Sequence, residues 1–253
     1  MRYLLILFIG LLLISNSSCQ ENDGKVKIFV SWPGASYPPG YIWEKGEAKP
    51  TGVEPKLIER ILEIAGYEYT FIDDYVYNKN GDVRLDVITD GKADITIRSI
   101  TITEDRKQNV TFSEPYYYDG ASALVLENNG IESKDDFQNK KVFAFDFTTA
   151  SDWAKKNLPE SEIVTFEDFS GNQLPEQLLL EGKIDVYLGD RTFLKTLLSK
   201  SPKFRLLDET YTREPFGIAV EKDRLQLLTD INKAIEQLKS TGELEKITSE
   251  FKK

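Results

Sequence analysis

One arginine stands where a carboxylate-binding group can be built. Thr103 can accept a backbone N–H bond with its side chain and so begin a helix, which places Arg106 in the first turn. A guanidinium there, beside backbone N–H groups that lack helical partners, is suited to hold a carboxylate. Arginine offers a planar fork that contacts both carboxylate oxygens, which lysine cannot do. The alternative is a surface ion pair between Arg106 and Glu104 or Asp105.

The elements around Arg106 indicate two similar α/β units. Short apolar runs alternate with helical patterns along the chain, which predicts α/β layers with largely parallel sheets. The sequence Gly-Lys-x-Asp occurs at 91–94 and again at 182–185, each time directly before a short apolar run. Open α/β sheets bind ligands beyond the carboxyl ends of their strands. We therefore expect 98–101 and 189–190 to face a shared cleft.

A helix of the first unit shows clear boundaries. It is expected from about Pro55, because proline is tolerated in the first turn of a helix. Its apolar positions at 57, 58, 61, 62 and 65 form one stripe. Gly66 is expected to end it in a left-handed conformation.

The composition excludes several kinds of site. The 253 residues are 40% apolar and 29% charged, as in an ordinary soluble domain. A net charge of −10 argues against nucleic acid or anionic membrane surfaces as partners. The chain has no histidine and a single cysteine, which excludes Ser-His-Asp and Cys-His catalysis and removes the usual zinc and haem ligands. We expect no metal site and no other cofactor.

The N-terminus is typical of an export signal. Arg2 precedes an apolar run over 4–14, which is shorter than the roughly 20 residues that a membrane span needs. The prediction is a signal peptide over 1–18, with an uncleaved anchor helix as the alternative. Cys19 stands at the expected cleavage point, and this segment resembles the lipobox of bacterial lipoproteins, although position 16 is Asn where that box usually has Leu.

The lipobox resemblance implies that Cys19 is acylated and that 19–25 forms a short tether. Acyl chains would hold the protein at a membrane surface without spanning it. The alternative is an ordinary signal peptide followed by an incidental cysteine.

Residues 94–117 carry a specific family resemblance. The run Asp-Ile-Thr-Ile-Arg-Ser-Ile-Thr-Ile-Thr-Glu-Asp-Arg at 94–106 is followed by Phe-Ser-Glu-Pro-Tyr at 112–116. These motifs resemble those of the family-three extracellular solute-binding proteins of ABC importers, and the similarity extends along the rest of the mature chain. The resemblance implies an α/β, periplasmic-binding-protein-like type II fold with two lobes and a hinge of two crossover strands.

The resemblance also implies where the lobes divide. Lobe 1 is expected to comprise 26–120 together with 214–253, and lobe 2 to comprise 121–213. Two crossings would join them, near 119–121 and near 212–215.

The family pattern implies roles for four polar residues of the cleft. Ser99 and Thr101 match residues that bind the ammonium and carboxylate of the ligand, and Arg106 matches the carboxylate clamp. Asp190 matches a second-lobe acid that pairs with the α-ammonium group. A cation and an anion on opposing lobes would together recognise a zwitterion. The alternative for Asp190 is a helix cap before Arg191.

Three further positions are candidates for ligand contact. Thr149 matches a second-lobe hydroxyl that holds the carboxylate, but Phe147 stands where relatives often have glycine, which puts the local geometry in question. Tyr37 and Trp32 could close over the ligand, or could equally be ordinary core aromatics.

The sequence thus predicts an exported, monomeric solute-binding protein that captures an amino acid or a related acid for an ABC permease. It predicts no catalytic residue. One alternative is an enzyme of the same fold that dehydrates a small carboxylic acid, with Glu44, Glu114 and Asp146 as candidate acid/base groups. The other is a ligand sensor, which would require a membrane span downstream, and the sequence to Lys253 has none.

Overall fold

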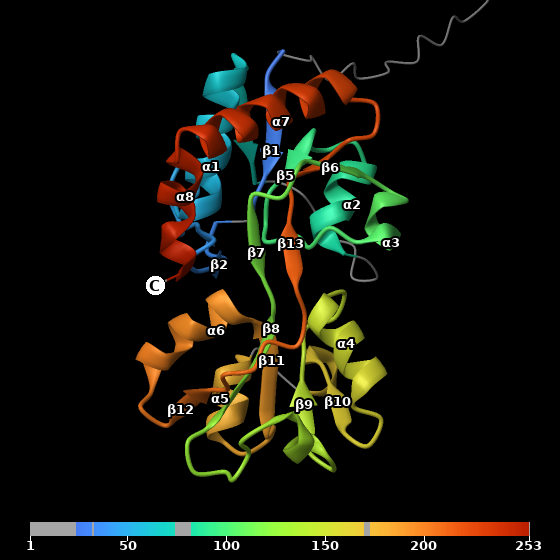
Figure 1. The fold of residues 1–253 in the computed structure, drawn as a ribbon, viewed down its shortest axis with the longest axis vertical. Coiled ribbons are helices and arrows are strands. Elements are labelled where there is room, and N and C mark those ends of the chain that lie inside the picture. Colours follow the sequence, from blue (N-terminus) through green and yellow to red (C-terminus); the bar gives the residue numbers. More distant parts are fainter. Residues whose placement is uncertain (1–23, 32, 74–81, 170–172, 253) are drawn as a thin grey trace, which may run out of the picture.

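The computed structural model describes residues 24–31, 33–73, 82–169 and 173–252. The chain forms two α/β lobes that follow one another along the long axis of the molecule (Figure 1). Each lobe is built on a five-stranded sheet with helices against it. This architecture confirms the predicted two-lobed α/β fold. Within the described ranges, no helix is both long enough and apolar enough to cross a membrane.

The sheet of lobe 1 has the strand order β4-β1-β5-β14-β6. Strands β4, β1 and β5 are parallel, whereas β14 is antiparallel to both of its neighbours. The strands of this lobe are β1 (Val26–Phe29), β2 (Ser36–Tyr37), β3 (Tyr41–Ile42), β4 (Tyr69–Ile72), β5 (Ile95–Thr96), β6 (Thr111–Phe112) and β14 (Ala219–Val220). Its helices are α1 (Val53–Ala65), α2 (Val83–Thr89), α3 (Glu104–Lys107), α7 (Leu225–Ser240), α8 (Glu243–Thr248) and the 3₁₀ helix η4 (Ser249–Lys252).

The sheet of lobe 2 has the order β10-β9-β11-β8-β12, with β10, β9 and β11 parallel and β8 antiparallel to β11 and β12. Each sheet has two parallel and two antiparallel strand pairs, so both sheets are mixed and the prediction of largely parallel sheets is wrong. The strands are β8 (Ala121–Leu126), β9 (Lys141–Phe143), β10 (Glu162–Val164), β11 (Val186–Asp190) and β12 (Phe204–Leu206). The helices are α4 (Thr149–Asn157), α5 (Pro175–Leu180), α6 (Arg191–Leu197) and the 3₁₀ helices η1 (Lys134–Phe137), η2 (Phe166–Asp168) and η3 (Leu198–Lys200).

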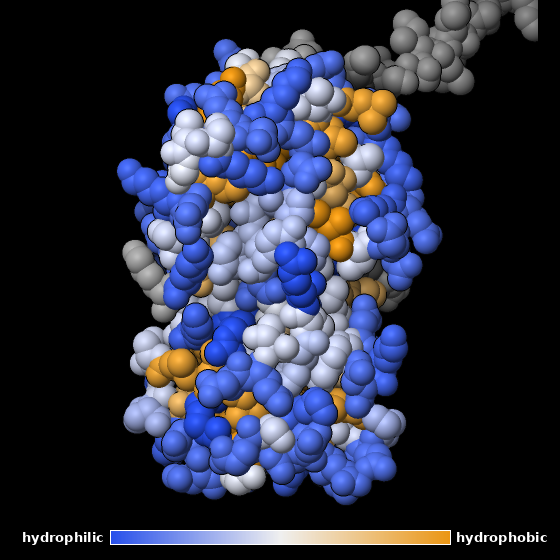
Figure 2. Space-filling model, in the orientation of Figure 1, coloured by the Kyte–Doolittle hydropathy of each residue, from blue (hydrophilic) through white to orange (hydrophobic). Residues whose placement is uncertain are grey.

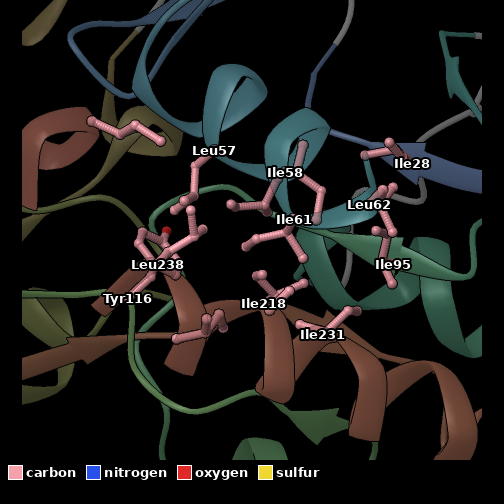
Figure 3. Packing of buried hydrophobic residues seen from close by; sticks show 14 of the residues in the cluster. Ile28, Leu57, Ile58, Ile61, Leu62, Ile95, Tyr116, Ile218, Ile231 and Leu238 are labelled. Atoms are coloured by element: carbon pink, nitrogen blue, oxygen red, sulfur yellow. The ribbon is translucent and has the colours of Figure 1, made fainter. Parts of the chain in front are cut away.

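The core of lobe 1 explains why α1 forms where it does. Leu57, Ile58, Ile61 and Leu62 are fully buried and pack toward Ile218 and the apolar side chains of α7 (Figure 3). Gly66 ends the helix at a φ of 77°, as predicted. The helix begins at Val53, two residues before the predicted start. The outer surface seen in Figure 2 is largely hydrophilic over both lobes.

The repeated Gly-Lys-x-Asp sequence has the same structural role in both lobes. In lobe 1, the Asp94 N–H donates to the Lys27 carbonyl of β1 at 3.0 Å, and the Asp94 carboxylate accepts the N–H of Lys27 at 2.7 Å. In lobe 2, the Asp185 carboxylate accepts the N–H of Lys141 at 2.8 Å, and the Asp185 N–H donates to the Lys141 carbonyl. Each aspartate thus fixes the start of its own strand against the neighbouring parallel strand.

Two antiparallel strands join the lobes. Strand β7 (Tyr117–Asp119) leads out of lobe 1, strand β13 (Glu214–Phe216) leads back, and Tyr118 lies opposite Pro215 (Figure 1). This pair is the predicted hinge of two crossover strands. The division of the chain at 120/121 and 213/214 is consistent with it and remains our proposed boundary.

Gly120, at the lobe 2 end of β7, is expected not to tolerate a side chain. A Cβ atom there would lie 2.3 Å from the carbonyl oxygen of Thr212 and 2.2 Å from a methyl carbon of Thr210. Gly120→Ala must therefore displace one crossing strand, and we expect a loss of about 2 kcal/mol in the free energy of unfolding, measured by urea denaturation. Gly189→Ala is the matched control, because its Cβ would meet no atom closer than 3.6 Å. Equal stability of the two variants would contradict this reading.

Candidate functional site

A cleft of about 340 Å³ lies between the lobes, at the carboxyl ends of strands from both sheets. Six of the predicted ligand-binding residues line it: Tyr37, Ser99, Thr101 and Arg106 from lobe 1, and Thr149 and Asp190 from lobe 2. Trp32, the seventh, lies outside the described residues. Of the candidate acid/base groups, Asp146 lines the cleft, whereas Glu44 and Glu114 are exposed and are not among its lining residues.

Arg106 points into the cleft rather than pairing on the surface. Its backbone N–H donates to the hydroxyl of Thr103 at 3.3 Å, which confirms the predicted cap. Its guanidinium donates to the carbonyls of Thr101 at 2.8 Å and Phe147 at 2.9 Å, and its side chain is 11% exposed. The surface-pairing alternative is wrong, because the Arg106 side chain is buried and the carboxylate that it approaches is Asp82 at 3.6 Å, while Glu104 pairs with Lys107.

The charge on Arg106 is held in an environment that opposes it. Burial, followed by the nearby Arg84 guanidinium, lowers the pKa of Arg106 to about 10. Arg106 is therefore still protonated at neutral pH. A carboxylate placed beside it would relieve this electrostatic cost, which favours an anionic group at this point of the cleft.

A second guanidinium, that of Arg84, was not predicted from the sequence and contacts the same Phe147 carbonyl as Arg106. Arg84 lies in the first turn of α2 and binds Asp82 through two bonds of 2.7 Å. It also donates to the Phe147 carbonyl at 2.7 Å. Although burial alone would raise the pKa of Asp82, Arg84 and Arg106 hold it below its usual range. Two arginines of lobe 1 thus converge on one backbone oxygen of lobe 2.

Phe147 takes the backbone conformation that glycine would favour. Its φ is 58°, in the left-handed region that is costly for residues with a Cβ atom. The conformation turns the Phe147 carbonyl toward Arg84 and Arg106, while its ring is 48% exposed.

Replacing Phe147 tests this strain. Because glycine adopts a positive φ without steric cost, we expect Phe147→Gly to be about 1 kcal/mol more stable than Phe147→Ala. Both variants lose the same exposed ring, so the comparison isolates the backbone. Urea denaturation of the two proteins gives the difference, and an alanine variant as stable as the glycine variant would show that the strain is absent.

A buried carboxylate joins three segments behind the ligand-facing surface. Glu214 of β13 is 1% exposed and accepts hydroxyl bonds from Thr101 at 2.6 Å, Thr149 at 2.5 Å and Thr212 at 2.7 Å. These threonines come from lobe 1, from lobe 2 and from the returning crossing. In this structure the hydroxyls of Thr101 and Thr149 thus donate hydrogen bonds to the Glu214 carboxylate, which orients both side chains.

Asp190 faces the cleft because another residue caps the helix that follows it. The side chain of Asp190 makes no cap bond with α6. Asp119 caps this helix instead: its carboxylate accepts hydrogen bonds from the N–H of Thr192 at 3.1 Å and from the Thr192 hydroxyl at 2.5 Å. The helix-cap alternative for Asp190 is therefore wrong. Burial, then the charges of Glu214 and Asp119, raise the pKa of Asp190 well above its usual range.

Tyr37 contacts lobe 2 directly. Its hydroxyl donates to the Asp190 carboxylate at 3.1 Å, and its ring stacks on Phe193 with centroids 4.0 Å apart and an angle of 7°. The aromatic contact expected with a ligand is made here with a residue of α6. Tyr37 therefore helps hold the lobes together and positions Asp190.

Ser99 is held by a second buried acid. Its φ is 47°, and its N–H and hydroxyl both donate to Glu54 of α1, at 2.5 and 3.1 Å. The hydroxyl of Tyr116 donates to the same oxygen at 2.5 Å. Burial raises the pKa of Glu54, while the bonds from Tyr116 and Ser99 oppose that rise. Glu54 thus positions the strand end from which Ser99 faces the cleft.

Comparison with known proteins identifies the family. The model of the bacterial extracellular solute-binding proteins, family 3, matches residues 28–253. The chain belongs to this family. It is 30% identical to the glutamine-binding protein GlnH of Bacillus subtilis over 165 residues, 65% of this chain and 59% of that protein. It is 27% identical to the L-cystine-binding protein TcyJ of Escherichia coli over 219 residues, 85% of this chain and 79% of that protein.

A solved structure supports the same assignment. An ancestral arginine-binding protein bound to arginine superimposes with a TM-score of 0.74 at 27% identity, covering 90% of this chain and 98% of that one. The family and these relatives confirm the predicted solute-binding class and favour a binding protein over an enzyme. These relatives are named for binding glutamine, L-cystine and arginine, so they share the amino-acid class of ligand but not one side chain.

Proposed function

We propose that this solute-binding protein captures a free amino acid outside the cytoplasm and delivers it to an ABC permease. The observation that carries the proposal is the placement of Arg106 and Asp190, which line one cleft from opposite lobes. Arg106 would hold the α-carboxylate in its planar fork. Asp190 would accept the α-ammonium group. The hydroxyls of Ser99, Thr101 and Thr149 donate to Glu54 or Glu214 in this structure, so their oxygens would act as acceptors toward the ammonium group.

The proposed ligand couples binding to closure of the lobes. A zwitterion contacts Arg106 and Asp190 together only when the lobes approach each other, so it binds the closed arrangement more tightly than an open one. The crossings β7 and β13 would absorb the change in backbone angles while each sheet stays rigid. The closed form is the one that a permease could distinguish from the empty protein.

The N-terminus supports a membrane-attached location. We infer that Cys19 carries the lipid, that 1–18 are removed and that 19–25 tether the binding domain. The acyl chains would keep the protein near its permease without a spanning helix. Mass spectrometry of the membrane fraction would reveal a diacylated or triacylated N-terminal peptide beginning at Cys19. A free thiol at Cys19 in the mature protein would refute the anchor.

A thermal-shift screen of residues 20–253 against the amino acids tests the binding proposal. A ligand that binds only the folded state raises the melting temperature. At a concentration of 100 times its Kd, it adds about 2.7 kcal/mol to the free energy of unfolding. We expect a shift with at least one L-amino acid and none with the matching amine or des-amino acid, since each lacks one half of the zwitterion. A dicarboxylate or cyclic acid that shifts the protein while every amino acid fails would refute the proposal.

A further inference from the structure

Three threonine hydroxyls donate to the two oxygens of the buried Glu214 carboxylate. Those of Thr101 and Thr149 donate to the same oxygen, Oε2, at 2.6 and 2.5 Å, and that of Thr212 donates to Oε1 at 2.7 Å. Three donors suit an ionised carboxyl group, which can only accept. Thr101 and Thr149 line the cleft, whereas Thr212 is not among its lining residues. Two of the three hydroxyls therefore lie between Glu214 and the space for the ligand.

The backbone holds these two hydroxyls beside Glu214. Thr101 pairs with Phe216 of β13 in an antiparallel bridge, which keeps it next to the crossing strand. Thr149 is the first residue of α4, and the side chain of Thr148 caps this helix. Because Glu214 is 1% exposed, a hydroxyl that turned away from it would leave a buried charge with one partner fewer, which is unfavourable.

The two hydroxyls can therefore offer a ligand only their lone pairs, since each has a single proton. The oxygens of Thr101 and Thr149 both lie within 2.6 Å of one Glu214 oxygen, so they are at most about 5 Å apart. Two acceptors that each lie about 2.9 Å from a tetrahedral nitrogen are separated by about 4.7 Å. The spacing thus allows one ammonium group to donate to both hydroxyls at once.

Asp190 adds a third acceptor to this cluster. It lines the same cleft, and its pKa is raised first by burial and next by the charge of Glu214. The two carboxylates are therefore close enough to repel each other, which a cation bound beside them would offset. A primary ammonium group has three N–H donors, and these match one carboxylate and two hydroxyl oxygens.

We propose that Glu214 is a positioning residue that makes the site selective for a primary ammonium group over N-methylated amino acids, betaines and 2-hydroxy acids. The inference rests on the proposed function, because it requires the α-ammonium group to lie at Asp190. Each N-methyl group removes one N–H donor, and a 2-hydroxy acid offers a single neutral donor. A site built to bind a donor rejects analogues that lack it, because its own buried polar groups are left unpaired.

Isothermal titration with the standard L-amino acids, each beside its N-methyl derivative, tests the selectivity. We expect the tightest-binding amino acid to lose at least about tenfold in affinity on one N-methylation, and more as its N,N,N-trimethyl betaine. Its 2-hydroxy analogue should bind at least about 100-fold more weakly than the amino acid. An N-methyl derivative that binds within about threefold of its parent would overturn the proposal.

Two valine variants separate an acceptor in the cleft from support of the hinge. Thr149→Val and Thr212→Val each remove one hydroxyl from Glu214, but only Thr149 lines the cleft. We expect Thr149→Val to lower affinity about tenfold for the parent amino acid and less than about threefold for its N-methyl derivative, which already lacks one donor.

Thr212→Val is the matched control. It also loses the bond that the Thr212 hydroxyl accepts from the Ala121 N–H at 2.8 Å, so it disturbs the fold at least as much as Thr149→Val. The ratio of the two affinities should nevertheless stay as in the unmodified protein. Equal losses for the parent and its N-methyl derivative in Thr149→Val would mean that the hydroxyl only supports the hinge, and would overturn the proposal.

Glu214→Met tests the positioning residue itself. Methionine has a similar length but cannot hold the two hydroxyl protons, so Thr101 and Thr149 become free to donate into the cleft. We expect the amino acid to bind about 100-fold more weakly, while its 2-hydroxy analogue, which can accept those protons, binds at least as tightly as before. A supporting role alone would lower both affinities alike and would overturn the proposal. If this variant does not fold, the valine pair decides.

The outcomes distinguish this inference from the proposed function. If amino acids bind and depend on Arg106 and Asp190, but N-methylation costs nothing, the proposed function stands and the role of Glu214 fails. If no amino acid binds the unmodified protein, both fail. Near-UV circular dichroism of each variant verifies that its fold is intact before its affinity is interpreted.

Discussion

Arg106→Ala is expected to abolish measurable amino-acid binding while the protein remains folded. The guanidinium is proposed to hold the α-carboxylate, and its removal leaves that carboxylate in the cleft without its principal partner. Truncating one member of a buried, hydrogen-bonded charge pair typically costs 2–5 kcal/mol. At about 1.4 kcal/mol for each factor of ten, this cost corresponds to a fall in affinity of roughly 30- to 4,000-fold. Isothermal titration with the best ligand from the thermal-shift screen measures it.

Two matched variants make this prediction specific. Lys107→Ala removes the neighbouring cation, which is exposed and pairs with Glu104 in the same short helix, so binding should be unchanged. Arg106→Lys keeps the charge but loses the fork and should bind weakly. Arg106 also donates to the carbonyls of Thr101 and Phe147, so circular dichroism must show native structure. An alanine variant that is folded and retains affinity would refute the clamp.

The parts of the site that could be predicted from sequence are those encoded locally. Thr103 and Arg106 are three residues apart, and a cap followed by a first-turn arginine is a pattern that short-range geometry determines. Asp190 is the last residue of strand β11, so its place at the carboxyl end of the sheet follows from the strand itself. The lobes were predictable for the same reason, because each Gly-Lys-x-Asp sequence marks the start of a parallel strand.

The parts that could not be predicted depend on contacts between distant segments. Glu214 accepts hydrogen bonds from the hydroxyls of Thr101, Thr149 and Thr212. No spacing in the sequence relates Thr101 or Thr149 to Glu214. The convergence of Arg84 and Arg106 on the Phe147 carbonyl likewise appears only after lobe 2 is placed against lobe 1. Sequence patterns describe single elements, whereas these contacts are properties of the closed cleft.

Strand β8 shows the corresponding limit for the fold. Residues 121–125 are all buried, so the strand has no polar alternation that would reveal its period. A strand covered on both faces is buried along its whole length, here with Ser122 as a buried polar residue, and its direction cannot be read from that pattern. Its antiparallel pairing with β11 and β12 is what makes the second sheet mixed.

Asp190→Asn is expected to weaken binding and stabilise the fold at the same time. The asparagine side-chain oxygen can still accept the hydrogen bond from the Tyr37 hydroxyl, so the substitution changes mainly the charge. Without the carboxylate, the α-ammonium group loses its partner, and affinity should fall about 100-fold by the same cost of an unpaired buried charge. Asp208→Asn, at an exposed position of lobe 2, is the matched control and should change neither property.

The stabilisation follows from the pKa of Asp190, which burial and the charges of Glu214 and Asp119 raise in the folded protein. A carboxyl group with a raised folded pKa contributes its full stability below its unfolded pKa and loses it as pH rises through the folded value. The unmodified protein therefore bears a cost at neutral pH that asparagine removes. Thermal denaturation at pH 7 should show a higher melting temperature for Asp190→Asn, and the difference should shrink toward pH 3.

Ligand affinity should depend on pH in the opposite sense to stability: the contribution of Asp190 to stability is lost as pH rises, whereas affinity is lost as pH falls. Only the ionised carboxylate attracts the ammonium group, so the affinity of the unmodified protein should decrease as pH falls through the raised pKa of Asp190. The ligand in turn favours ionisation, so binding should release protons in this range, which titration in buffers of different ionisation enthalpy detects. Asp190→Asn should show neither effect from this residue. A variant that is less stable than the original protein, with an unchanged pH profile, would mean that the carboxylate stabilises the empty cleft and does not bind the ammonium group.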